Sequence, residues 1–133
     1  MSLKSNSEYK KYNEISDLLK DSCVAYTYAL NEDDLFKNVD RIFKYCKKKK
    51  IIPKRVYFDI CKENDIRFKP SLQNLFINEE NLDILTIDYE SLFSYADRYD
   101  IARELDENNL GIYLIEDDDY LLERKPMLYW LSK

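Results

Sequence analysis

The segment from residue 31 to residue 55 constrains the fold more than any other part of the chain, because it has the pattern of one long amphipathic helix. Its apolar side chains recur at spacings of three, four and one, which places them on one helix face. They are Leu35, Phe36, Val39, Ile42, Phe43 and Cys46. Acidic residues begin the segment and lysines end it, an order that complements the helix dipole. We therefore predict a helix over residues 33–49.

The chain contains a single glycine among its 133 residues, so it has few positions where the backbone adopts a positive φ without a steric penalty. This scarcity disfavours a sandwich or barrel rich in tight hairpins and favours helices. Helical spacing also predicts a first helix over residues 6–30, and the short connection at Asn31 predicts that the two helices form an antiparallel hairpin. Further helices are expected after Pro53, after Pro70 and over residues 88–106.

The C-terminal part of the chain changes character, because two apolar runs there flank a short acidic turn. Residues 111–115 and 120–122 lie on either side of four acidic residues, a pattern that predicts a β-hairpin. Residues 82–87 fit a strand or a helix equally well, since a short apolar run has no resolvable period. We therefore predict a mainly α, α+β fold: one domain over residues 1–133, with four to five helices and a small C-terminal antiparallel β-hairpin. The expected core comprises Leu18, Leu19, Val39, Ile42, Phe43, Ile60, Leu92, Phe93, Leu114 and Trp130.

Neither a membrane span nor a secretion signal is visible in the sequence. The longest run without charge has ten residues, whereas a helix that crosses a bilayer needs about 20. The N-terminal residues lack the apolar stretch of a signal peptide. Cys23, Cys46 and Cys61 lie beside apolar positions and form no C-x-x-C pair. We therefore expect free, buried thiols in a cytoplasmic protein that has no cofactor, no bound metal and no membrane partner.

The common catalytic motifs are missing from the sequence. No histidine is present, which excludes histidine-based triads and acid–base catalysis by histidine. One glycine is too few for a phosphate-binding P-loop, a dinucleotide fingerprint or a G-x-S-x-G nucleophile elbow. What remains for an enzyme is carboxylate chemistry assisted by a lysine. We therefore assign no catalytic residue and expect a protein that is not an enzyme.

One small constellation resembles the D…E-x-K pattern of metal-dependent nucleases. It consists of the acidic residues 117–119, followed by Glu123 and Lys125. In that family the carboxylates hold a divalent cation and the lysine steadies the attacked phosphate or its water. The acids here lie only four to six residues before Glu123, which is closer than that family's pattern. This resemblance implies a nuclease-like enzyme as a minor alternative.

The charge is divided unevenly along the chain. Residues 1–78 hold sixteen basic and eleven acidic residues, a net charge of +5, whereas residues 79–133 hold five and fifteen, a net charge of −10. The stretch 44–55 contains seven basic residues and no acid, which is typical of contact with a phosphate backbone. These residues are Lys44, Lys47, Lys48, Lys49, Lys50, Lys54 and Arg55. The structural alternative is that the lysines end a helix and keep the following loop soluble.

The acidic C-terminal half, which is also rich in tyrosine, favours a different function. Dense carboxylates beside exposed tyrosines can occupy a basic groove by mimicking phosphates, and aromatic enrichment fits a binding surface. The candidate partner-binding residues are Asp97, Asp100, Glu104, Glu116, Asp117, Asp118, Asp119 and Tyr120. Our main hypothesis is a non-enzymatic, immunity-type or anti-defence inhibitor, bacterial or phage-encoded, that binds a protein with a basic surface. The alternative, ranked second, is a nucleic-acid-binding regulator that uses residues 44–55.

Overall fold

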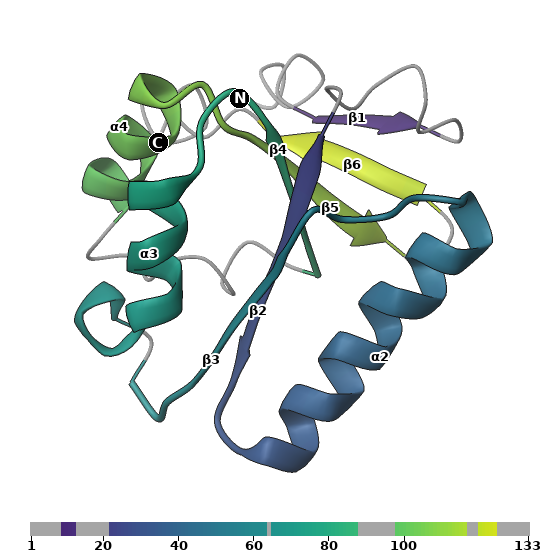
Figure 1. Cartoon of the computed structure of the whole chain (residues 1–133), viewed down its shortest axis with the longest axis horizontal. Helices are drawn as coiled ribbons and strands as arrows, with labels where there is room; N and C mark the ends of the chain where they lie inside the picture. Colours follow the sequence, from purple (N-terminus) through teal and green to yellow (C-terminus); the bar gives the residue numbers. More distant parts are fainter. Residues whose placement is uncertain (1–8, 13–21, 64, 88–97, 117–119, 125–133) are drawn as a thin grey trace.

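The computed structural model describes residues 9–12, 22–63, 65–87, 98–116 and 120–124, and its strands form one mixed sheet (Figure 1). The order across the sheet is β1-β6-β5-β4-β2-β3. Strands β2 to β5 are parallel to one another, and β6 and β1 extend one edge in antiparallel pairing. The bounds are Tyr9–Tyr12 for β1, Cys23–Ala29 for β2, Val56–Ile60 for β3, Asp83–Thr86 for β4, Gly111–Glu116 for β5 and Tyr120–Arg124 for β6.

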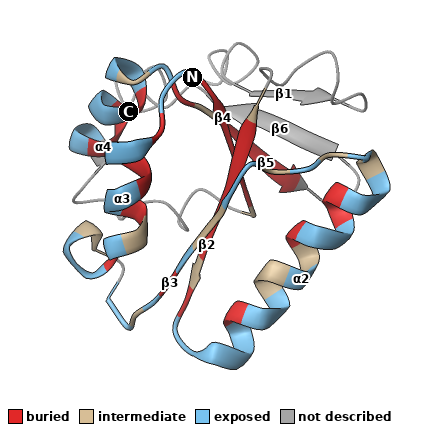
Figure 2. Ribbon diagram, viewed as in Figure 1, coloured by how far each residue is buried: buried red, intermediate tan, exposed pale blue. Residues whose placement is uncertain are grey.

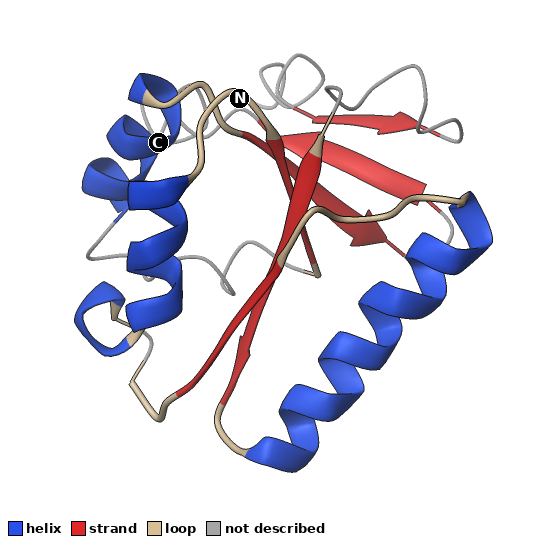
Figure 3. Ribbon diagram, viewed as in Figure 1, coloured by secondary structure: helices blue, strands red, loops and turns tan. Residues whose placement is uncertain are grey.

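A helix connects each successive pair of parallel strands, as parallel pairing requires. Helix α2 (Glu32–Lys49) joins β2 to β3, α3 (Pro70–Asn78) joins β3 to β4, and α4 (Arg98–Glu107) joins β4 to β5. A short 3₁₀ turn, η2 (Ile66–Phe68), precedes α3. Helix α2 covers one face of the sheet, and α3 and α4 cover the other (Figure 3). Right-handed crossovers produce this division, because the chain moves from β2 to β3 in one direction and then back past β2 to β4 and β5.

The core consists of two apolar layers, one on each side of the sheet (Figure 2). Along β2, Val24 and Tyr26 pack toward α3 and α4, whereas Cys23 and Ala25 pack toward α2. A strand buried on both faces has an almost continuous apolar run rather than an alternating one. This is why β2 shows no clear strand period in the sequence.

The predicted long helix is confirmed, and its ends have the expected chemistry. The side chain of Asn31 accepts a hydrogen bond of 2.8 Å from the backbone N–H of Asp34, which caps the first turn. Lys50 ends the helix in the left-handed conformation, with φ of 59°. Asn81 and Asn109 also have positive φ, whereas Gly111 does not. The chain therefore makes its left-handed positions without glycine, and glycine scarcity did not exclude a sheet.

The predicted fold class is wrong: the described residues form an α/β fold around a parallel sheet, not a helical domain with a separate hairpin. Within the expected helix 6–30 lie strands β1 and β2, and the expected helix after Pro53 is strand β3. The antiparallel helical hairpin is therefore absent from the described residues. Helix α3 and the 98–106 part of the last helix are confirmed, and residues 88–97 lie outside the described ones. Strands β5 and β6 do pair antiparallel, but β5 also pairs with β4, so this pair belongs to the main sheet.

The predicted core is confirmed in part. Ile42 and Leu114 are buried and Val39 is half-buried, but Phe43 is 49% exposed and Ile60 is 48% exposed, which contradicts the prediction for both. The remaining five predicted core residues, Leu18, Leu19, Leu92, Phe93 and Trp130, lie outside the described residues.

Two of the three cysteines have the expected burial. Cys23 and Cys46 are buried free thiols, and Cys61 is only half-buried. The sequence showed no membrane span. Among the described helices, none is both long and apolar enough to cross a bilayer.

Candidate nucleic-acid interface

Helix α2 has three different surfaces along its length. Its buried face packs on the sheet through Leu35, Ile42, Tyr45 and Cys46. A second surface, the basic flank, carries cations spaced four, three and four residues apart, which places them on one side of the helix. The basic flank comprises Lys37, Arg41, Lys44 and Lys48. A third surface, the aromatic flank, lies on the other side of the buried face from the basic flank and comprises Phe36 and Phe43.

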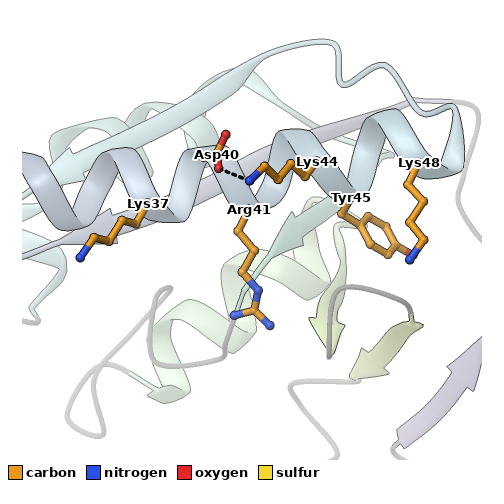
Figure 4. Close-up of a pocket in the computed structure, with 6 residues that line it drawn as sticks. All are labelled: Lys37, Asp40, Arg41, Lys44, Tyr45 and Lys48. Carbon is orange, nitrogen blue, oxygen red and sulfur yellow. Dashed lines mark ion pairs between the residues drawn. The ribbon is translucent and has the colours of Figure 1, made fainter.

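An open pocket of about 380 Å³ lies along the basic flank (Figure 4). Its described lining consists of the four basic-flank residues with Asp40 and Tyr45. The side chains of Arg41, Tyr45 and Lys48 extend from the same side of the helix in Figure 4. Tyr45, which also lines the pocket, is buried beside these cations. Four positive groups and one carboxylate therefore line a cavity large enough for a phosphate or a sugar-phosphate unit.

Among the described pocket residues, the carboxylate of Asp40 forms an ion pair with one of the cations. Lys44 Nζ lies 3.0 Å from Asp40 Oδ2, and the two side chains are largely exposed. Surface pairs of this kind contribute only about 0–1 kcal/mol, because water and salt screen them. A phosphate can therefore compete with Asp40 for Lys44 at little energetic cost.

The lysine run 47–50 forms the last turn and the C-cap of α2. Lys47, Lys48 and Lys49 are the last three helical residues, and the backbone N–H of Lys50 points back to the carbonyls of Cys46 and Lys47. Cations here lie at the negative end of the helix dipole, so they stabilise the helix as well as adding positive charge. Any anion at this end would be held by side chains, because the backbone presents carbonyls rather than N–H groups.

Lys54 and Arg55, also predicted as nucleic-acid residues, have a structural role. Lys54 Nζ lies 3.6 Å and Arg55 Nη1 lies 3.2 Å from the carboxylate of Glu79, whose side chain is only 2% exposed. The hydroxyl of Tyr57 donates a 2.6 Å hydrogen bond to the same carboxylate. Burial, together with that hydrogen bond, raises the pKa of Tyr57. A buried carboxylate needs such partners, so this cluster joins β3 to the end of α3.

The sequence therefore identified part of the basic flank and missed another part. Lys44 and Lys48 belong to the predicted stretch and line the pocket. Lys37 and Arg41 were missed because they precede the continuous lysine run. Their spacing of four and three residues from Lys44 on a predicted helix is the signal that would have found them.

The predicted acidic binding residues do not form a described cluster. Asp100 accepts a 3.0 Å hydrogen bond from Arg103, and the carboxylate of Glu104 lies 3.4 Å from Asn108 Nδ2, all on exposed positions of α4 and its C-terminal end. Glu116 ends β5 directly opposite Tyr120 at the start of β6. Asp97 and Asp117–Asp119 lie outside the described residues. Of the nuclease-like constellation, only Glu123 falls on a described element, β6.

A second polar network lies where β3 ends and α3 begins. The carboxylate of Asp59 accepts hydrogen bonds from the backbone N–H groups of Ser71 (2.9 Å) and Leu72 (3.1 Å) and from the hydroxyl of Tyr26 (2.8 Å). Burial and the neighbouring carboxylate raise the pKa of Tyr26. Lys69 is fully buried, with its ammonium 4.0 Å from the centre of the Tyr28 ring. Asp59 thus caps α3 from a neighbouring strand, a role that sequence analysis did not identify.

The carboxyl ends of β2 and β4 are where open α/β sheets usually bind ligands, because the strand order reverses there. In this chain the first turn of α2, which follows β2, carries Glu32, Asp33 and Asp34. Three carboxylates at this position repel phosphate groups. Among the described residues, the basic flank is therefore a more favourable site for an anionic ligand than the carboxyl ends of β2 and β4.

Comparisons with known proteins relate the chain to others by fold alone. Neither a protein-family profile nor a curated protein matches the sequence. The structure is similar to the C-terminal catalytic domain of ISC1926 TnpA, an IS607-like serine recombinase, with a TM-score of 0.59 and 18% identity over 71% of this chain and 67% of that one. It is also similar to a serine recombinase from Sulfolobus solfataricus, with a TM-score of 0.56 and 11% identity over 74% of this chain and 73% of that one.

These similarities overturn the main functional prediction. We expected a helical, non-enzymatic inhibitor, whereas the described residues have the fold of serine recombinases, which are enzymes. Missing histidine and glycine motifs exclude only the chemistries that require them. They did not justify the broader conclusion that the chain is no enzyme.

Proposed function

We propose that this chain binds nucleic acid through the basic flank of α2, on a fold that resembles serine recombinase catalytic domains. The observation that carries the proposal is the pocket itself, where four cations and a buried tyrosine line one side of one helix. The fold similarity supports it, because the similar proteins are recombinases. The proposal corresponds to the alternative in the sequence analysis, with its centre moved from residues 44–55 to residues 37–48.

The dimensions of the basic flank suit a nucleic-acid backbone. Lys37 and Lys48 are eleven positions apart on α2, which corresponds to a row about 16 Å long at about 1.5 Å per residue. The charged groups of such a row suit contacts with successive phosphates of one strand, and phosphate contacts carry no sequence information. Binding should therefore depend on charge and hardly on base sequence.

The test is a charge reversal on the basic flank with a matched control. The double variant Lys37→Glu, Lys44→Glu changes two exposed cations of the pocket. The control Lys62→Glu, Arg103→Glu makes the same change in net charge at exposed positions outside the pocket. Binding to labelled duplex and single-stranded oligonucleotides would be measured by fluorescence anisotropy at fixed salt. We expect the pocket variant to lose affinity at least about tenfold, equivalent to about 1.4 kcal/mol, and the control to lose much less.

Circular dichroism and thermal unfolding of both variants show whether the fold is retained. Equal losses of affinity in the two variants would mean that only the net charge matters, which contradicts a localised site. Retained affinity in a folded pocket variant would contradict the proposal directly. The two oligonucleotide forms distinguish a preference for duplex from a preference for single strands.

A further inference from the structure

Strand β3 forms one edge of the sheet, and among the described strands it pairs only with β2. Arg55 accepts a hydrogen bond from the N–H of Ala25, and the N–H of Cys61 donates to Ala29. Alternate residues of a strand in a parallel ladder face the partner strand, so positions 55, 57, 59 and 61 face β2. The backbone N–H and C=O groups of Val56, Phe58 and Ile60 therefore point outward from the sheet.

The same edge is unusually apolar. Phe58 and Ile60 share a face of β3 with Val56, which packs into the core layer beneath α2. Phe58 is 49% exposed and Ile60 is 48% exposed. The aromatic flank of α2 lies on the side of the helix away from the pocket, and it adds Phe36 and Phe43, which are also about half exposed or more. Natural edge strands usually carry charges, prolines or bulges that prevent pairing with another strand. Val56, Phe58 and Ile60, whose backbone groups point outward, are all apolar and none is a proline.

We propose that β3 binds the β3 strand of a second copy of this chain, in antiparallel register about a twofold axis at Phe58. In this register Phe58 of one copy lies opposite Phe58 of the other, and Val56 of one lies opposite Ile60 of the other. The strand is thus self-complementary, as a twofold interface requires. Its single charged residue, Asp59, is already satisfied by Tyr26 and the start of α3, so no like charges face each other within the paired strands.

The size of the apolar surface is compatible with this partner. A phenylalanine or isoleucine presents about 150–200 Å² when fully exposed, so the four half-exposed side chains offer about 400 Å² per copy. A standard stable interface buries about 800 Å² per partner, and the paired edge backbone with the adjoining side of α2 supplies the remainder. An antiparallel pair about a perpendicular twofold axis places both α2 helices on the same face of one continuous sheet. The basic flanks stay open, so the dimer presents two pockets to one nucleic acid.

The experiment measures the mass of the full chain in solution, by light scattering after size exclusion, without nucleic acid. At micromolar concentrations we expect twice the chain mass of 16.1 kDa. Phe58→Lys places a charge at the twofold axis and should give a monomer. Ile77→Lys, at a 78% exposed position of α3, is the matched control and should leave the dimer intact. A monomeric wild-type chain overturns the proposal, and so does a dimer that the folded Phe58→Lys variant retains.

Cross-linking provides a second measurement that does not depend on the Phe58→Lys variant folding. Because the N–H and C=O of Phe58 point outward, the two copies of Phe58 would form a hydrogen-bonded antiparallel pair. The Cα atoms of such a pair are about 5.5 Å apart, within the range for a disulfide. In a Cys61→Ser background, Phe58→Cys should form a covalent dimer under mild oxidation, and Ile77→Cys should not. Equal cross-linking of the two variants, or none with Phe58→Cys, overturns the register.

Discussion

Cys23 and Cys46 lie in the core layer beneath α2, one on strand β2 and one on the helix. Burial raises the pKa of each thiol to about 11, and for Cys23 the nearby Cys46 and Asp83 add to the effect. Both residues are therefore neutral thiols over the whole physiological range. Cys61, which is half-buried at the end of β3, has a pKa raised by burial but opposed by Lys69.

The two buried thiols predict a loss of stability at alkaline pH. Below the ordinary thiol pKa of 9.0 they are protonated in both the folded and unfolded states. Above it the unfolded chain releases protons that the folded chain keeps until about pH 11, so the free energy of unfolding falls between pH 9 and pH 11. We expect about 1–3 kcal/mol per thiol, measured by urea unfolding at several pH values.

The control for this pH dependence is the double variant Cys23→Ala, Cys46→Ala. It lacks both thiols, so its free energy of unfolding should fall less steeply over the same interval, even though tyrosines and lysines still titrate. A variant whose pH profile runs parallel to that of the wild-type chain would show that the thiols do not contribute.

Among the elements, α3 shows how a strand can fix the position of a helix. Its N-terminal N–H groups are capped by Asp59 of β3, and Lys69 before the helix provides no side-chain cap. Asp59 also accepts a hydrogen bond from the hydroxyl of the buried Tyr26, so this one carboxylate links β2, β3 and α3. These hydrogen bonds hold the start of α3 against the sheet, near the carboxyl ends of β2 and β3.

Replacing that carboxylate tests its contribution. Asp59→Ala leaves the N–H groups of Ser71 and Leu72 and the hydroxyl of Tyr26 without their acceptor, so we expect a loss of about 2–4 kcal/mol in the free energy of unfolding. Asp59→Asn keeps one acceptor oxygen and should lose less. Urea unfolding of the three proteins gives the comparison. Equal stability of Asp59→Ala and the wild-type chain would mean that water replaces the cap.

At the scale of the whole molecule, the basic flank and the acids of α4 lie on opposite faces of the sheet, although α2 also carries Glu32, Asp33 and Asp34 in its first turn. The basic flank belongs to α2, whereas the described acids Asp100 and Glu104 belong to α4 on the other face (Figure 1). Each helix packs about 10 Å from the sheet, so about 20 Å separates them, which exceeds the screening length of about 8–10 Å at physiological salt. The acids of α4 therefore do little to cancel the positive charge of the pocket, although the chain has a net charge of −5.

This separation predicts a defined salt dependence of nucleic-acid binding. Four cations can neutralise at most four phosphates, so the slope of log affinity against log salt should be no steeper than about −3.6 for duplex DNA and about −2.8 for single strands. The Lys37→Glu, Lys44→Glu variant should have a slope shallower by about 1.8 on duplex. Affinity that does not change with salt would exclude phosphate contacts as its source.

The sequence by itself indicated that the residues of α2 and α3 are helical. Helix α2 was predicted over residues 33–49, one residue short of its observed start, and a helix was predicted after Pro70, where α3 begins. Helix hydrogen bonds join residues four apart, and the cap of α2, Asn31, lies directly before it. The same local spacing makes the basic flank recognisable, since its members are three or four residues apart on one helix. For these features, all the interacting groups lie within a short stretch of chain.

Only the tertiary structure decided the strands and therefore the fold. Strand β2 pairs with β3 and with β4, so Ala25 lies beside both Val56 and Leu85, which are far from it in the sequence. Because β2 is buried on both faces, its apolar run has no period that distinguishes a strand from a helix. The exposure of Ile60 follows from β3 being an edge strand, and that of Phe43 from its position outside the face of α2 that packs on the sheet. The capping role of Asp59 follows from its position beside α3. A local pattern cannot specify these features, because the groups that determine them meet only when the sheet assembles.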